Sequence, residues 1–348
     1  MTSCDYCTQL PDIEEKGRLF LYYKGEESIA IENQLKIMNR EFSVDNSIFC
    51  IDYQSIEDVL TFLTQMHELL PMQEQSKIYG TWSNKTNRRF SKMVSFSELL
   101  TRINHIDFVT VINHRLFTQH LQPIISLEND EIYGYEFLLR QTNDDFPFQP
   151  GKLFSFSQQA GLQSMLDSQA RISSIEISSS LLETGQKRFI NFLPSSIYDP
   201  NHCLKSTFKA VEQFHVDPSD LVFEVVETEK IENIAHLKTI FQVYQAHGIH
   251  VALDDLGSGY ATVEVLQELK PDFAKIDRHL IDHCDEDKNK QGKIKQIIEI
   301  ASAYDITLLA EGIERKEELE YCKDVGISLA QGFYIGKPNP KPIKELFL

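Results

Sequence analysis

Residues 250–259 read HVALDDLGSG, and this stretch decides the fold because it joins a short apolar run to two acids and a glycine-containing turn. Three apolar residues lead directly into Asp254 and Asp255, which predicts a buried strand with a polar carboxyl end. Such strands are typical of parallel sheets in α/β proteins. Taken alone, an Asp-Asp pair before Gly-Ser-Gly is more often a turn with side-chain hydrogen bonds than a functional site.

The same arrangement recurs on both sides of this stretch, where polar groups interrupt or follow short apolar runs. A single Glu, Asn or Lys of this kind usually has a structural role, but here they stand at equivalent ends of successive predicted strands. Barrel enzymes place their active sites at that end, so we expect these groups to converge. They are Glu224 and Glu227 in LVFEVVE (221–227), Asn191 in FINFLP (189–194), Lys275 in FAKIDR (273–278), and Glu311 and Glu314 in TLLAEGIE (307–314).

Apolar runs alternate with amphipathic stretches from about residue 107 to the end of the chain, which predicts repeated β-α units. Eight strands in about 240 residues favour a (β/α)8 barrel over an open sheet. The first two are separated by only residues 128–132, which is hairpin spacing, so we expect an antiparallel opening strand and hence a modified TIM barrel. The predicted strands are 122–127, 133–139, 189–192, 221–226, 250–253, 273–276, 307–310 and 329–335, and the predicted helices are 151–160, 165–182, 231–247, 292–304 and 316–325.

Residues 1–106 predict a separate, smaller α/β module, with the barrel domain occupying 107–348. The module contains neither a phosphate-binding glycine pattern nor an acidic cluster of its own, so we expect a regulatory or dimer-forming role. Its predicted strands are 19–24, 48–53 and 77–82, and its predicted helices are 28–40, 56–70 and 95–103.

Composition restricts the classes of function. The formal net charge is -18, whereas proteins that bind nucleic-acid polymers by neutralising phosphates cluster Lys and Arg, so we expect no such partner. No apolar run approaches the roughly 20 residues that span a bilayer, which predicts a cytoplasmic protein without membrane insertion. The six scattered cysteines are typical of reduced thiols. Cys4 and Cys7 have the spacing of half a zinc site, but a second pair is missing and a ragged N-terminus is the simpler interpretation.

Several carboxylates in one pocket require compensation, because like charges at close range raise one another's pKa. Oxygen ligands, from carboxylates and an Asn carbonyl, suit Mg²⁺ or Mn²⁺ better than zinc. Neighbouring acids such as Asp254 and Asp255 could hold two ions that activate a water and stabilise displacement at phosphorus. Lys275 adds a point charge suited to a phosphoryl oxygen or the attacking water.

Together these motifs resemble the EAL-domain family of cyclic di-GMP phosphodiesterases over about residues 107–340. The segment HLQPIISLENDEIYGYEFLLR (120–140) is similar to the family's opening hairpin, with Glu136 as the signature acid. The resemblance implies hydrolysis of one 3′–5′ phosphodiester of cyclic di-GMP to linear pGpG with two metal ions, and a homodimer. It assigns metal binding to Glu136, Asn191, Glu224, Asp254 and Asp255, catalytic or loop-steadying roles to Lys275, Glu311, Glu227 and Gln331, and substrate contacts to Gln122, Pro123, Leu138, Arg140 and Glu314.

Two positions depart from the family pattern. The signature reads Glu136-Phe137-Leu138 where the family has Glu-Ala-Leu, and Ser328 stands where an Asp is frequent. Strand alternation sends Glu136 and Leu138 to one face and Phe137 to the other, so Phe137 should pack between strand and helix. The substitution leaves an alternative open, a catalytically weak receptor for cyclic di-GMP, and a barrel hydrolase for another diester is a third possibility.

Overall fold

The computed structural model describes residues 10–25, 29–84, 92–225, 234–258, 261–343 and 346. Cys4, Cys7 and Glu227 lie outside these residues. The described chain divides into two compact units, one formed by residues 1–117 with 141–166 and the other by residues 118–140 with 167–348. Each unit is considered by itself, and the predicted division after residue 106 remains a prediction.

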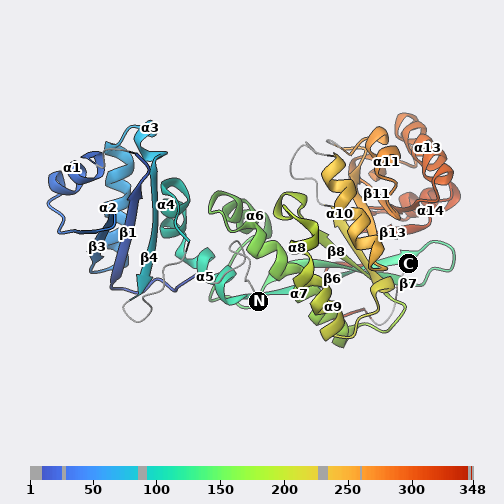
Figure 1. Ribbon diagram of the computed structural model, residues 1–348. Coiled ribbons are helices and arrows are strands. Elements are labelled where there is room, and N and C mark those ends of the chain that lie inside the picture. Colours follow the sequence, from blue (N-terminus) through green and yellow to red (C-terminus); the bar gives the residue numbers. More distant parts are fainter. Residues whose placement is uncertain are drawn as a thin grey trace. The chain divides into compact units, whose positions relative to one another are not determined.

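The first unit contains a five-stranded antiparallel sheet in the order β2-β3-β1-β4-β5. Alternate apolar residues of β1 and β3 point to one face and pack there against the helices α1, α2 and α4, which explains the period-two pattern of these strands. The strands are β1 (Gly17–Tyr23), β2 (Ser43–Asp45), β3 (Ile48–Tyr53), β4 (Ile78–Asn84) and β5 (Val94–Ser95); the helices are α1 (Ile29–Ile37), α2 (Ile56–Leu69), α3 (Met72–Gln75), α4 (Phe96–Asn104), α5 (Ile106–His114) and α6 (Pro150–Gln159) (Figure 1).

Helix α6 belongs to this first unit although it follows β7 of the barrel in sequence. It packs against α4, where the buried guanidinium of Arg102 donates from Nε to the carbonyl oxygen of Ala160 at 2.7 Å. Burial lowers the pKa of Arg102 to about 10, which still leaves it charged at neutral pH. Residues 141–166, which lie between β7 and β8 in sequence, are therefore part of the first unit and are held there by α4.

The second unit is a closed eight-stranded barrel in the order β10-β11-β12-β13-β6-β7-β8-β9. The strands from β7 to β13 run parallel, whereas β6 pairs antiparallel with β13, as the hairpin spacing predicted. The strands are β6 (Phe117–Ser126), β7 (Ile132–Gln141), β8 (Lys187–Phe192), β9 (Leu221–Val225), β10 (His250–Leu256), β11 (Phe273–Ile276), β12 (Thr307–Ala310) and β13 (Leu329–Gln331).

Helices surround these strands and bury their outward side chains (Figure 1). The five predicted helices are present with shifts of a few residues, and the sequence reading missed the short α8, α9, α11 and α12. The last predicted strand was too long, because the chain turns away from the sheet after Gln331. The helices are α7 (Gln163–Leu181), α8 (Pro200–Cys203), α9 (Lys205–Gln213), α10 (Ile234–Ala246), α11 (Val263–Leu269), α12 (Arg278–Ile281), α13 (Lys288–Ala303) and α14 (Lys316–Asp324).

A second apolar cluster fills the inside of the barrel and is separate from the outer strand–helix core. It takes one inward side chain from each of seven strands, with Tyr133 of β7 packed against it. Three aromatic rings meet in it, since Phe189 lies 5.4 Å from Phe273 and Tyr133 contacts both. The seven residues are Ile124, Phe189, Val222, Ala252, Phe273, Leu309 and Leu329, and we call them the barrel plug.

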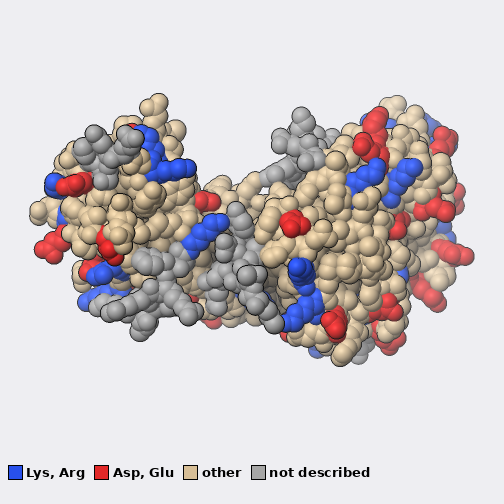
Figure 2. Space-filling view, viewed as in Figure 1, with Lys and Arg blue, Asp and Glu red and all other residues tan. Residues whose placement is uncertain are grey.

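Two further observations concern the charged surface and the apolar character of the helices. Lys and Arg are scattered among Asp and Glu on the face drawn in Figure 2. Among the residues that the structure describes, no helix combines the length and the apolar character needed to cross a membrane.

Phe223 provides a test of the outer core. It is fully buried on β9 and its ring stacks on Tyr244 of α10 with centroids 4.5 Å apart. Phe223→Ala should lower the free energy of unfolding by about 3–5 kcal/mol, measured by urea denaturation followed by circular dichroism. Tyr198→Ala, at a residue that is 53% exposed, should cost less than about 0.5 kcal/mol. Equal midpoints for the two variants would contradict this assignment of the core.

Candidate active site

A single ammonium group lies among four carboxylates at the carboxyl end of the parallel strands. The Nζ atom of Lys275, on β11, is 2.5 Å from Oε2 of Glu224, 2.7 Å from Oε1 of Glu311, 3.2 Å from Oδ1 of Asp254 and 3.7 Å from Oε2 of Glu136. Lys275 is 1% exposed and Glu224 is completely buried. Of the groups predicted to converge, Glu224, Asp254, Lys275 and Glu311 therefore lie together, whereas Glu227 lies outside the described residues.

The register of the strands explains why these residues meet. Side chains two positions apart on a strand point to the same face, so seven of the site residues lie one layer above a residue of the barrel plug. The antiparallel β6 obeys the same rule in reverse, because Gln122 precedes its plug residue by two positions. The pairs are Phe189 with Asn191, Val222 with Glu224, Ala252 with Asp254, Phe273 with Lys275, Leu309 with Glu311, Leu329 with Gln331, and Ile124 with Gln122.

Two amide side chains hold the signature acid. Glu136 accepts a hydrogen bond on Oε1 from Nδ2 of Asn191 at 3.0 Å and one on Oε2 from Nε2 of Gln331 at 2.8 Å. Both bonds cross between strands of the barrel, β7 to β8 and β7 to β13. They fix the direction of the Glu136 carboxylate and leave the amide oxygens of Asn191 and Gln331 to face other groups.

Phe137 points away from this site. It is 3% exposed and belongs to the outer core, together with Tyr135 of the same strand. The departure from the family's signature is therefore accommodated between strand and helices, and the two hydrogen bonds of Glu136 are unaffected. This is the placement that strand alternation predicted for Phe137.

Asp255 stands apart from its neighbour because the strand is irregular there. The pairing of β10 with β11 shifts between Leu253 and Leu256, and Asp255 has a φ of 53°, a left-handed conformation that Asp tolerates better than most residues. Its amide donates to Oδ1 of Asp254 at 3.0 Å. The irregularity lets two consecutive acids serve one site, which strict alternation would forbid, and carboxylate oxygens of Asp254, Asp255 and Glu311 lie within 4.8 Å of one another.

Burial and mutual repulsion perturb the titration of these groups. Burial, with smaller contributions from Asp254 and Asp277, raises the pKa of Asp255 to about 6. Burial likewise raises the pKa of Glu224 and of Glu311 well above the usual range for a glutamate. For Lys275 burial acts to lower the pKa, but the surrounding acids outweigh it and raise the pKa well above its ordinary value. The ammonium therefore stays charged at neutral pH.

A cavity of about 170 Å³ opens beside Glu136. Glu314 lies at its edge, where Oε1 is 2.9 Å from Nη2 of Arg278. Gly312 has a φ of 70° in this wall, and a Cβ there would come within 2.5 Å of the Arg278 side chain. The lining residues are Gln122, Glu136, Arg278, Glu311, Gly312, Glu314, Gln331, Gly332 and Phe333.

The remaining predicted residues lie around this centre with fewer contacts. Gln122 donates from Nε2 to the carbonyl oxygen of Gly336 at 3.3 Å, and Pro123 is buried beside the same glycine. Leu138 is half-buried on β7. Arg140 is half-buried too, and its Nη1 donates to the carbonyl oxygen of Leu139 at 2.7 Å.

Sequence reasoning missed two charged residues of the site. Asp277, which caps α12, contributes to the raised pKa of Asp255, and Arg278 lines the cavity. Both follow β11 directly, so the rule that polar residues at strand ends are functional candidates would have found them.

Comparison with known proteins agrees with this geometry. A family model for the EAL domain matches residues 108–338. The probable cyclic di-GMP phosphodiesterase PdeG of Escherichia coli K12 is 28% identical over 261 residues, covering 72% of this chain and 49% of the relative. The probable cyclic di-GMP phosphodiesterase PdeB of the same strain is 30% identical over 250 residues, covering 70% and 47%. The chain thus spans about half the length of these relatives.

Solved structures share the fold. The standalone EAL protein of Vibrio cholerae O395, determined with c-di-GMP bound, is 31% identical with a TM-score of 0.59, covering 65% of this chain and 93% of that one. Klebsiella pneumoniae BlrP1, in a complex with calcium and cyclic di-GMP, is 18% identical with a TM-score of 0.59. That match covers 93% of this chain and 96% of the other, so the likeness of fold extends to the N-terminal unit. The family model, the barrel and its ordered motifs agree, and the chain belongs to the EAL domain family.

Proposed function

We propose that this protein hydrolyses one phosphodiester bond of cyclic di-GMP and releases linear pGpG. The observation that carries the proposal is the contact of Lys275 with four carboxylates, one of which is held by Asn191 and Gln331. Relatives named as cyclic di-GMP phosphodiesterases support the choice of substrate.

The donor set fits divalent cations. Five acids meet here and face one ammonium group, so the site carries excess negative charge in a buried place, which is costly without cations or protons. Oε1 of Glu224 is buried and accepts no hydrogen bond from the described part of the chain. We infer that Glu136, Asn191, Glu224, Asp254 and Asp255 hold two ions, with Mg²⁺ or Mn²⁺ favoured by the all-oxygen ligands. When bound, such ions supply a water of lowered pKa and neutralise charge on the phosphate.

The chain's own residues orient the reaction. Because Lys275 remains an ammonium, it acts as a fixed positive charge toward a phosphoryl oxygen and does not act as a base. Glu311, whose pKa is raised, is suited to take a proton from the attacking water. Oε1 of Gln331 is buried without a hydrogen-bond donor among the described residues, so it can accept from that water while Nε2 holds Glu136.

Substrate contacts are proposed for the residues around the cavity. At about 170 Å³ it is smaller than the roughly 300–1,000 Å³ of sites that enclose a whole ligand, so a dinucleotide would insert only one part. We propose that Arg140 binds a phosphate and that Gln122, Pro123, Leu138 and Glu314 contact the rest. Glu227 is proposed to steady the chain after Asp255.

The receptor alternative was motivated by Phe137 and by the additional N-terminal unit. The ring of Phe137 is buried outside the site and so no longer favours it, whereas the N-terminal unit keeps it as a competing function. Hydrolysis of another diester remains the competing activity, and other cyclic dinucleotides added as competitors distinguish it. The homodimer, the cytoplasmic location, the absence of nucleic-acid and membrane partners, and a regulatory or dimer-forming N-terminal unit stay predictions.

The proposal is tested by turnover. With Mg²⁺ or Mn²⁺ the purified protein should convert cyclic di-GMP to pGpG, followed by chromatography. Glu136→Gln should reduce kcat by about 100-fold or more, because it exchanges a charged ligand for an amide at the centre of the site. Glu131→Gln, the same change at an exposed position of the same hairpin, should leave the rate unchanged. Tight binding without turnover in the unsubstituted protein would favour a receptor instead.

Cation binding has a test that does not depend on activity. Mn²⁺ at about 100 times its Kd should stabilise the protein by about 2.7 kcal/mol, measured as a rise in Tm. Asp254→Asn should remove most of that rise. Asp282→Asn, at an acid in another cluster near α12, should keep it. The same rise in all three proteins would argue against the proposed ligands.

Lys275 links stability to pH in a chelator-treated sample. In Lys275→Met the acids lose the ammonium that lowers the pKa of Glu224 and Glu311, so both pKa values rise further. The native variant then binds more protons than its unfolded state, and its stability increases as the pH falls from 7 to 5. We expect a loss of about 3–5 kcal/mol at pH 7 that shrinks toward pH 5.

Lys295→Met, at an exposed position of α13, is the control and should lose little at either pH. A deficit in Lys275→Met that is constant between pH 5 and 7 would refute this electrostatic account. Both variants are compared by urea denaturation at each pH.

A further inference from the structure

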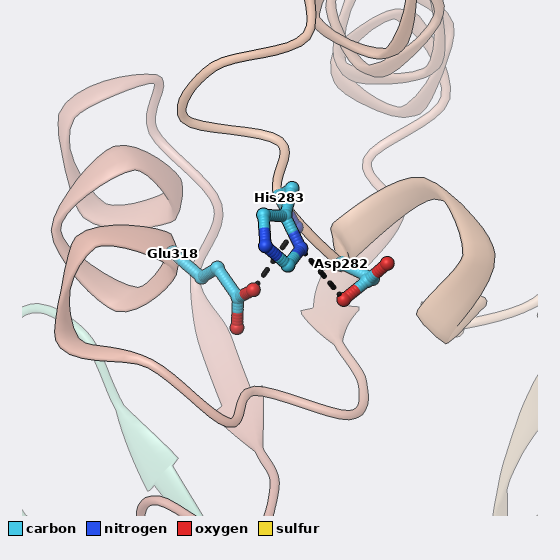
Figure 3. A group of neighbouring side chains, drawn as sticks. All are labelled: Asp282, His283 and Glu318. Atoms are coloured by element: carbon cyan, nitrogen blue, oxygen red, sulfur yellow. Dashed lines mark hydrogen bonds and ion pairs between the residues drawn. The ribbon is translucent and has the colours of Figure 1, made fainter.

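Glu318 is a buried carboxylate that the proposed reaction does not use. It lies in the first turn of α14 and is 1% exposed. Figure 3 shows its carboxylate directed toward His283, in the segment between α12 and α13, whose ring faces Asp282. A buried carboxylate requires hydrogen-bond donors. The residues that supply these donors show which segments of the chain the carboxylate connects.

Within the described part of the chain, the donors to Glu318 are backbone amides from two separate segments. Oε1 accepts from the amide of His283 at 2.9 Å, and Oε2 accepts from the amides of Glu314 and Arg315 at 2.9 and 3.1 Å. The amides of Glu314 and Arg315 precede α14, where the helix dipole favours a negative charge. Glu318 therefore joins the segment after α12 to the segment that follows β12.

The joined segments carry residues of the candidate site. Residues 311–315 include Glu311, which contacts Lys275, and Glu314, which pairs with Arg278 at the mouth of the cavity. The side chain of Arg315 makes a second link between the two segments, with its Nη2 2.7 Å from Oδ2 of Asp285. Hydrogen bonds between backbone groups also attach this stretch. The amide of Glu311 donates to Ile276, that of Ile313 donates to Gln331, and that of Tyr334 donates to Ile313. Glu318 is thus a buried side chain that accepts from the backbone amides of this stretch, and mutation can remove it without changing the backbone of the site.

A metal ion is the competing interpretation, because ligand atoms of Asp282, His283 and Glu318 lie within 4.8 Å of one another. Both oxygens of Glu318 are engaged by amides, however, and Nδ1 of His283 lies 2.9 Å from Oδ1 of Asp282. His283 contributes to this link through its backbone amide, which any residue except proline supplies. The geometry therefore favours a structural link over a cation site.

We propose that Glu318 is a positioning residue for the phosphodiesterase reaction, holding residues 311–315 so that Glu314 faces the substrate. It acts through the amide of Glu314 and touches neither substrate nor the reacting atoms. The inference rests on the proposed function. Glu311 is anchored independently through Ile276 and Lys275, so loss of Glu318 should affect Glu314 more, and KM for cyclic di-GMP more than kcat.

Steady-state kinetics of four variants of the full chain test the proposal. Glu318→Ala should raise KM by about 10-fold or more, comparable to the lower end of the effect of removing a residue that orients a metal ligand. Glu318→Gln keeps one carbonyl oxygen as an acceptor and should recover part of the loss. Glu320→Ala, an exposed acid two positions along the same helix, should match the unsubstituted protein. His283→Asn should match it too, since Asn adopts the φ of 55° and retains the amide.

Hydrogen exchange of the backbone amides gives a readout independent of turnover. In Glu318→Ala the amides of Glu314 and Arg315 should exchange at least tenfold faster, while those of β11 and β12 stay protected. Unchanged exchange, or faster exchange with unchanged KM, overturns the positioning role. So does a lower Tm as the sole effect.

Loss of activity in His283→Asn, restored by added Zn²⁺, would point to the metal interpretation instead. If the unsubstituted protein neither binds nor hydrolyses cyclic di-GMP, the proposed function fails. The exchange measurement then still decides whether Glu318 holds residues 311–315.

Discussion

The structure depends on one electrostatic constraint, the balance between a buried ammonium group and the acids around it. Lys275 alone faces four carboxylates within 3.7 Å, and Glu224 has no access to water. Such a group is stable only while its charge is compensated, and the cations proposed for this site would supply that compensation. The buried charges lower the stability of the barrel at this point.

The barrel plug holds the acids around Lys275 in place. Seven apolar residues form a layer inside the strands, and on each of these strands a site residue stands two positions away, farther along the chain on the parallel strands and earlier on β6. A layer of close-packed side chains resists displacement, so the acids cannot relax away from one another by moving into the barrel. The irregularity at Asp255 departs from this repeat and adds a second acid where the regular pattern allows one.

The sequence predicted the barrel because each strand is a short apolar run with a polar end, and this pattern can be recognised from neighbouring residues alone. It predicted the reversed β6 from the shortness of the turn, and the outward position of Phe137 from strand alternation. The short helices α9 and α11 escaped notice because a few turns contain too little periodicity to identify. Nor could sequence distinguish Glu318 from exposed acids of the same helix, since its three partners are backbone amides brought together only by tertiary structure.

The reversed strand has a consequence for how the protein is made. Because β6 pairs with β13, the first strand of the barrel completes its pairing only when the last strand is present. The hydrogen bond from Gln122 to Gly336 likewise joins residues 214 positions apart in the sequence. During translation the edges of β6 and β12 stay unpaired until β13 leaves the ribosome, and open strand edges promote aggregation. A nascent chain truncated before β13 would therefore depend on chaperones, and the acidic centre forms only after β13 has emerged.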